Sequence, residues 1–108
     1  MLRIYPVILD WLDAIEPVVR LILSCDRHLG EQLRRSSTSV ALNVAEGMVG
    51  TGRAKTNAYR IACREMRESL TALEIAVRRG YVAAFAPDDE DRQQRIIATL
   101  IRLSASDR

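Results

Sequence analysis

The sequence is poor in the residues that build disulfide scaffolds, metal sites and long apolar segments. It holds two cysteines and one histidine, His28, among 108 residues. Two cysteines are too few for a disulfide framework, and Cys25 with His28 supplies only two of the four ligands that a tetrahedral metal site needs. Charged residues interrupt every apolar run before it reaches the roughly eighteen residues of a membrane span. We therefore expect no metal, no cofactor and no membrane insertion.

Aromatic residues are also scarce, at 5% of the chain, whereas hydrophobic residues make up 48% and charged residues 28%. This balance is typical of a globular protein whose core is packed by aliphatic side chains. No secretory signal pattern opens the sequence, so we expect a soluble, cytoplasmic protein. The length suits one domain, residues 1–108.

Apolar residues recur at steps of three and four, the spacing of amphipathic helices. The first helix carries its stripe at Ile4, Ile8, Trp11, Ile15, Val18, Ile22 and Cys25. Pro17 interrupts this helix with a predicted kink or short break. Gly47, Gly50 and Gly52 are predicted to end the second helix. The four predicted helices span residues of about 5–25, 27–48, 53–79 and 88–104.

The connections between these helices are only a few residues long, which favours antiparallel neighbours. The sequence thus predicts an all-α fold, an antiparallel up-and-down four-helix bundle. In the third helix, two series of apolar residues repeat every seven positions and form a heptad seam: Tyr59, Met66 and Leu73, and Cys63, Leu70 and Val77.

Five arginines share another face of the third helix, within about 60° of one another at 100° per residue. They are Arg53, Arg60, Arg64, Arg67 and Arg78. With Lys55 and Arg34 they are candidate contacts to a nucleic-acid backbone, each adding salt-dependent affinity. The alternative is that they pair with acids of a neighbouring helix or subunit, such as Asp88 to Asp91. The sequence leaves both open.

A polar set lies on one face of the second helix at offsets of four, four and three: Arg35, Ser39, Asn43 and Glu46. We interpret it as a structural network that fixes helix register or a subunit interface, in preference to a binding site, because an unpaired buried carboxylate is costly. Glu68 lies four residues from Arg64, a spacing that predicts an ion pair on the helix surface. No constellation indicates catalysis, so we expect no enzyme.

A set of motifs spreads over the second and third predicted helices and the residues next to them: Leu33-Arg34-Arg35-Ser36, Asn43-Val44-Ala45-Glu46-Gly47, Gly52-Arg53, Glu68 with Leu73-Glu74, and Gly80-Tyr81. With these motifs the sequence resembles the four-helix bundle proteins encoded in intervening sequences of 23S rRNA genes. The resemblance implies a bundle without enzymatic activity and a ring-shaped homo-oligomer, a pentamer. It also implies kinship with the accessory proteins of diversity-generating retroelements, and hence RNA or DNA and a reverse transcriptase as partners.

By position, the family core corresponds to Arg34, Arg35, Asn43, Glu46 and Gly47, followed by the basic residue Arg53. The sequence departs from the usual pattern at Ser36, Ala54, Thr56 and Asn57. We therefore predict a homo-oligomeric bundle that binds nucleic acid or a nucleoprotein through its arginine face. The alternative is an adaptor for a protein partner, with arginines in subunit contacts.

Overall fold

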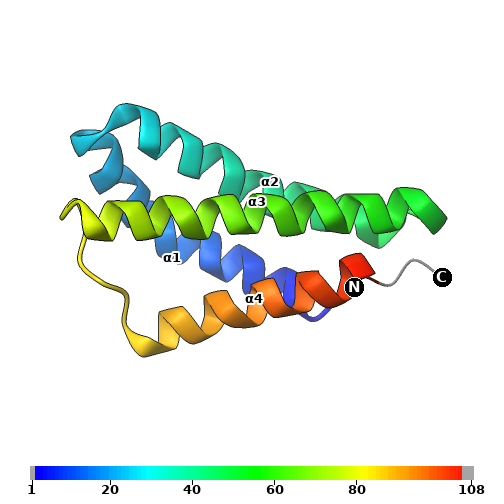
Figure 1. Ribbon diagram of the computed structural model, residues 1–108. Helices are drawn as coiled ribbons and strands as arrows, with labels where there is room; N and C mark the ends of the chain where they lie inside the picture. The colour runs from blue at the N-terminus through cyan, green and yellow to red at the C-terminus, as the bar shows by residue number, and fades with distance from the viewer. Residues whose placement is uncertain (1, 106–108) are drawn as a thin grey trace.

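Four α-helices, joined by short connections, form an antiparallel up-and-down bundle in the computed structural model, which describes residues 2–105 (Figure 1). No strand occurs within that range. Each helix begins and ends within one residue of its predicted bounds. The helices are α1 (Ile4–Cys25), α2 (Arg27–Val49), α3 (Gly52–Arg78) and α4 (Pro87–Ala105).

The longest helix, α3, lies between α2 and α4 and packs on both, whereas α1 packs on α2 and α4 (Figure 1). One face of each helix is apolar and turned inward. Burying a large aliphatic side chain contributes about 1.5–3 kcal/mol, so this core dominates the stability of the bundle. Its fully buried large residues include Ile8, Trp11, Ile15, Ile22, Leu33, Val40, Val44, Met66, Ile96 and Leu100.

The first helix continues through Pro17 from Ile4 to Cys25. Of the two alternatives predicted at Pro17, the short break is therefore wrong, and the kink stays a prediction. Proline removes one backbone hydrogen bond, to the carbonyl of Asp13. Both Pro17 and Asp13 are exposed, so water can satisfy that carbonyl and the helix can continue. The apolar stripe also differs slightly from the prediction, since Val19 is buried while Val18 is half-buried.

Two glycines inside α2 mark places where neighbouring helices approach closely. A Cβ at Gly47 would overlap the ring of Tyr59 on α3, and a Cβ at Gly30 would lie 2.9 Å from the Cα of Leu23 on α1. Of the three glycines predicted to end this helix, Gly50 is its C-cap, whereas Gly47 does not belong to the helix end. Gly47 lies within α2 and is buried, because the ring of Tyr59 occupies the space of a side chain.

A buried hydroxyl of α2, that of Ser36, also lies at the contact between α2 and α3. Ser36 and Ser37 are buried, and the hydroxyl of Ser36 lies 2.7 Å from that of Ser69 on α3. The Ser69 hydroxyl also lies 3.0 Å from the carbonyl oxygen of Glu65. Small side chains that satisfy one another let α2 and α3 pack closely without leaving a buried polar group unpaired.

Candidate nucleic-acid interface

The arginines predicted on one face of α3 are all exposed: Arg53, Arg60, Arg64, Arg67 and Arg78. Lys55 is exposed as well. Within residues 2–105, Arg53, Lys55, Arg64 and Arg67 form no ion pair. Their charges are therefore not neutralised by any described side chain of the protomer.

Arg60 has a structural contact that the sequence did not reveal. Its Nε donates a hydrogen bond of 3.3 Å to the backbone carbonyl of Ser104, in the last turn of α4. The carbonyls of the last turn lack partners within a helix and carry the negative end of its dipole, so a guanidinium is favourable there. Arg60 thus holds the end of α4 to the first third of α3.

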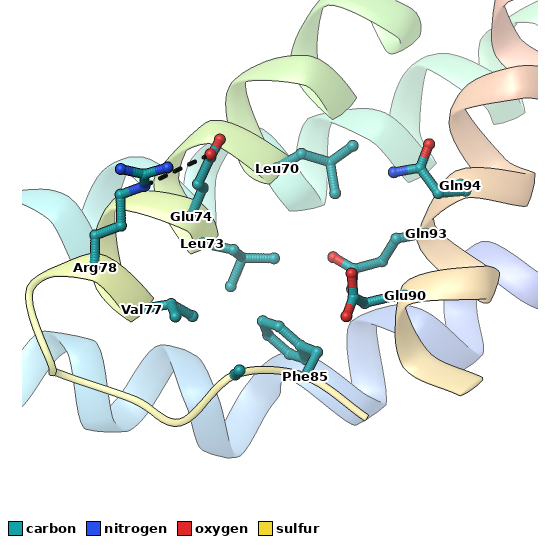
Figure 2. Close-up of a pocket in the computed structure, with 10 residues that line it drawn as sticks. Leu70, Leu73, Glu74, Val77, Arg78, Phe85, Glu90, Gln93 and Gln94 are labelled. Atoms are coloured by element: carbon teal, nitrogen blue, oxygen red, sulfur yellow. Dashed lines mark ion pairs between the residues drawn. The ribbon is translucent and has the colours of Figure 1, made fainter. Parts of the chain in front are cut away.

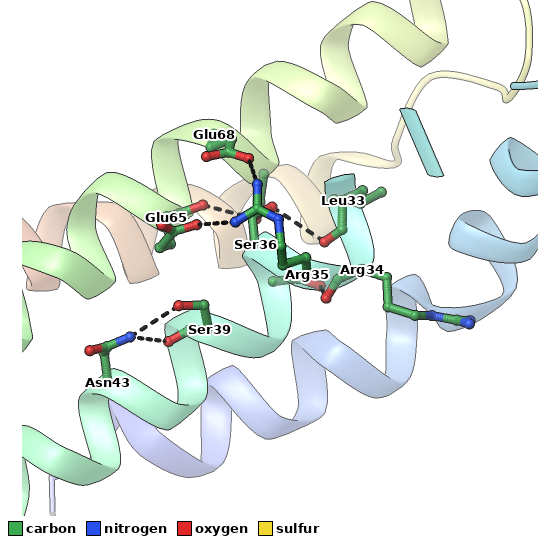
Figure 3. A network of polar contacts seen from close by, with 10 residues as sticks. Leu33, Arg34, Arg35, Ser36, Ser39, Asn43, Glu65 and Glu68 are labelled. Atoms are coloured by element: carbon green, nitrogen blue, oxygen red, sulfur yellow. Dashed lines mark hydrogen bonds and ion pairs between the residues drawn. The ribbon is translucent and has the colours of Figure 1, made fainter. Parts of the chain in front are cut away.

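Arg78 and Arg34 lie apart from the other candidates. Arg78 is near the far end of α3, with its Nε 3.8 Å from Glu74. Arg34 donates from Nη2 to Glu16 on α1 at 2.6 Å, and Arg20 contacts the same carboxylate oxygen at 3.1 Å. Figure 3 shows the Arg34 side chain pointing away from α3. Arg34 therefore belongs to the α1–α2 side of the bundle.

The four residues of the polar set predicted on α2 do not form one network; Figure 3 shows Arg35, Ser39 and Asn43. Arg35 reaches across to α3, where its Nη2 lies 2.7 Å from Glu68. Asn43 instead donates within α2, to the Ser39 carbonyl at 2.9 Å and to its hydroxyl at 3.0 Å. Glu46 is exposed and has no side-chain partner among the described residues. The structure thus brings Ser39 and Asn43 together and leaves Arg35 and Glu46 apart from them.

The predicted pair of Glu68 with Arg64 is wrong, because Glu68 pairs with Arg35. Arg35 also lies 3.8 Å from Glu65, whose carboxylate oxygen Oε1 is buried and accepts no hydrogen bond from the described residues. Glu65 is 8% exposed, so a single arginine balances two carboxylates of α3 where the helices meet. The helical spacing predicts the face of α3 on which Glu68 lies, but it does not predict which other helix packs beside that face.

Asp26 joins the two connections at one end of the bundle. Its Oδ1 accepts the backbone N–H of Leu29 at 3.1 Å, which makes Asp26 the N-cap of α2. Its Oδ2 also lies 3.5 Å from Nη1 of Arg79 and 3.4 Å from the hydroxyl of Tyr81. These partners are more than fifty positions away, so the sequence offered no signal for them.

Other kinds of site find little support in the described range. No three histidine, cysteine or acidic side chains between residues 2 and 105 gather as metal ligands would. Cys25 is exposed and Cys63 is buried, and both are free thiols. Among the described helices, none is long and apolar enough to span a membrane.

The fold and its exposed basic helix define an all-α bundle with one arginine-rich outer face. The chain belongs to the 23S rRNA-intervening sequence protein family, whose model matches residues 13–102. The fold is similar to that of a crystal structure from Bacteroides thetaiotaomicron, of a protein with unknown function from the S23 ribosomal protein family. The two share 20% identity with a TM-score of 0.77, over 95% of this chain and 99% of the other. At this identity the likeness shows the fold alone. No curated protein matches the chain.

Proposed function

We propose that the protein is a non-enzymatic, homo-oligomeric bundle that binds the phosphate backbone of nucleic acid through Arg53, Arg64 and Arg67. One observation carries the proposal. From Gly52 to Arg67, every exposed side chain of α3 is neutral or basic, because the only acid in that segment, Glu65, is buried against α2.

The spacing of these arginines suits an extended polyanion. Arg53 and Arg67 are fourteen positions apart, which corresponds to about 21 Å along a helix. Guanidinium groups bind phosphates with two parallel hydrogen bonds, and such contacts carry no sequence information. We therefore expect binding that depends on salt and little on base sequence.

The test is a titration of labelled duplex RNA and duplex DNA at two salt concentrations, with wild-type protein and the variant Arg64→Gln/Arg67→Gln. Losing two phosphate contacts lowers the slope of log K against log salt by about 1.8 for duplex DNA. Arg60 is not substituted in this variant, because it holds the end of α4 and its loss would also affect folding. The matched control is Arg20→Gln/Arg95→Gln, which removes the same charge from α1 and α4. Absence of binding at low salt, or an equal loss in the control, would refute the proposal.

The oligomer is supported by an apolar strip on the outer face of α2. Leu42 and Val49 are seven positions apart, and they are 62% and 82% exposed. We propose that a second copy of the chain covers them. Light scattering should show an oligomer that Leu42→Lys/Val49→Lys dissociates, and a monomeric wild-type protein would contradict this. The pentamer, a reverse transcriptase partner and kinship with retroelement accessory proteins stay predictions.

The alternative, that the arginines serve subunit contacts, is favoured by one observation. Arg60 already binds the end of α4 within the protomer, so arginines of this face do take structural roles. The titration of the Arg64→Gln/Arg67→Gln variant, combined with light scattering, distinguishes nucleic-acid binding from subunit contacts. If Arg64→Gln/Arg67→Gln lowers the oligomer mass and nucleic acid does not bind, the arginines are subunit contacts.

A further inference from the structure

The two series of the heptad seam of α3 differ in burial. Tyr59, Met66 and Leu73 are all buried, whereas the second series becomes more exposed toward the end of the helix. Cys63 is buried, whereas Leu70 and Val77, one and two heptads further, are only half-buried. The cause is the path of α4, whose end is held to α3 through Arg60 and whose start lies further away (Figure 1). The seam thus continues past the point where α4 covers it.

A cleft of about 350 Å³ lies where the two helices separate, between α3, the start of α4 and the connection that joins them. We call it the α3–α4 cleft. Its apolar floor is formed by Leu70, Leu73, Val77 and Phe85. Figure 2 shows Leu70, Leu73 and Val77 on the α3 side of the space, Glu90 and Gln93 on the α4 side, and Phe85 of the connection at the bottom, next to Glu90.

The polar groups of the cleft favour a cation. On the α3 wall, Glu74 and Arg78 offset each other in an ion pair of 3.8 Å. On the α4 wall, the carboxylate of Glu90 forms no ion pair with any described residue. Gln93 uses its amide nitrogen for the carbonyl of Asp89 at 3.2 Å, and no described donor occupies its amide oxygen. A carboxylate without an ion pair among the described residues, in the first turn of α4, therefore stands beside an apolar floor.

The shape favours a helix over a compact ligand. Leu70 and Val77 are seven positions apart, about 10.5 Å or two turns along α3. Apolar residues at this spacing pair with a second helix that carries side chains at positions i, i+3, i+4 and i+7. A basic residue on that helix would pair with Glu90, and its apolar stripe would complete the seam.

We propose that the α3–α4 cleft binds a short amphipathic helix of a partner protein, whose apolar stripe covers Leu70, Val77 and Phe85 and whose lysine or arginine pairs with Glu90. Arg78 lines the cleft, but Arg53, Arg64 and Arg67, the arginines proposed to bind nucleic acid, do not. A failure of nucleic-acid binding is therefore distinguishable from a failure of helix binding.

The probe is a fluorescein-labelled, fourteen-residue leucine–lysine peptide with leucines at helical spacing, titrated with full-length protein and followed by anisotropy. A peptide of the same composition with its leucine stripe scrambled is the control. We expect the amphipathic peptide to bind at least about tenfold more tightly than the scrambled one, a difference of about 1.4 kcal/mol. Equal binding of the two peptides would overturn the proposal.

Two protein variants locate the site. Val77→Lys places a charge on the floor, and Glu90→Lys reverses the carboxylate at an exposed position without touching the core. Each should weaken peptide binding about tenfold or more, whereas Glu31→Lys, the same charge change on α2, should not. Unchanged binding in both cleft variants would refute the site. If Val77→Lys instead lowers the oligomer mass, a second copy of the chain fills the cleft and the proposal is wrong.

Discussion

Replacing Gly47 by alanine tests whether the contact between α2 and α3 depends on a missing side chain. The added Cβ would overlap the ring of Tyr59 and lie 2.7 Å from two further ring atoms. The ring is 2% exposed, so no open space is available for it to move into. Overpacking of this kind costs about 3 kcal/mol at the upper end of its usual range, against a gain of about 1 kcal/mol from the better helix propensity of alanine. The expected net loss is about 2 kcal/mol.

The assay is thermal unfolding at one fixed protein concentration, because assembly would make the melting temperature depend on concentration. A loss of about 2 kcal/mol lowers Tm by about 8–16 °C in a domain of this size. In a Tyr59→Leu background the tyrosine ring is absent, so the Cβ added at position 47 has no ring to overlap. There, Gly47→Ala should raise the free energy of unfolding by up to about 1 kcal/mol. Thr38→Ala, at an exposed position of α2, reports propensity alone. A Gly47→Ala variant as stable as the parent, or the same loss in both backgrounds, would refute the reasoning.

Two further predictions concern Asp26 and Tyr59. Asp26→Ala removes the N-cap of α2 and the acceptor of the Tyr81 hydroxyl. It should lower the free energy of unfolding by about 1 kcal/mol or more, measured in a urea titration. Asp26→Asn keeps the cap and should lower the free energy of unfolding by less. An alanine variant no weaker than the asparagine variant would contradict this. Burial raises the pKa of Tyr59 above its ordinary value of 10.0. The unfolded chain therefore loses this proton first, so stability should fall as the pH rises above 10.0, and the fall should be smaller in Tyr59→Phe. Identical alkaline unfolding of the two proteins would show that Tyr59 does not contribute.

The fold was largely predictable because apolar spacing and helix-ending residues agree along the whole chain. The heptad seam of α3 and the proline that opens α4 placed those helices within one residue of their observed bounds. Gly47 was misjudged because glycine both ends helices and lets them approach, and only the position of Tyr59 decides between the two. Pro17 was misjudged because its exposure, which makes the lost hydrogen bond tolerable, is a property of the packed bundle.

The site was less predictable than the fold. Helical geometry correctly placed the α3 arginines on an exposed face, since that inference needs only the angle around one axis. Helical geometry did not predict that Arg60 holds the end of α4 or that Glu68 pairs with Arg35. Both contacts depend on which helix packs against α3 and on how far that helix is shifted along the α3 axis. Nucleic-acid binding by the remaining arginines stays a prediction.

The connection between α1 and α2 consists of a single residue, Asp26, and this limits how the chain can change in length. One residue inserted there would turn α2 by about 100° relative to α1 and rotate Leu33 and Val40 out of the core. The connection between α3 and α4 has eight residues, from 79 to 86, and can absorb a change without rotating either helix. Insertions, fused tags and cleavage sites should therefore be tolerated between the exposed Ala83 and Ala84 of that connection. The same changes at Asp26 should unfold the protein.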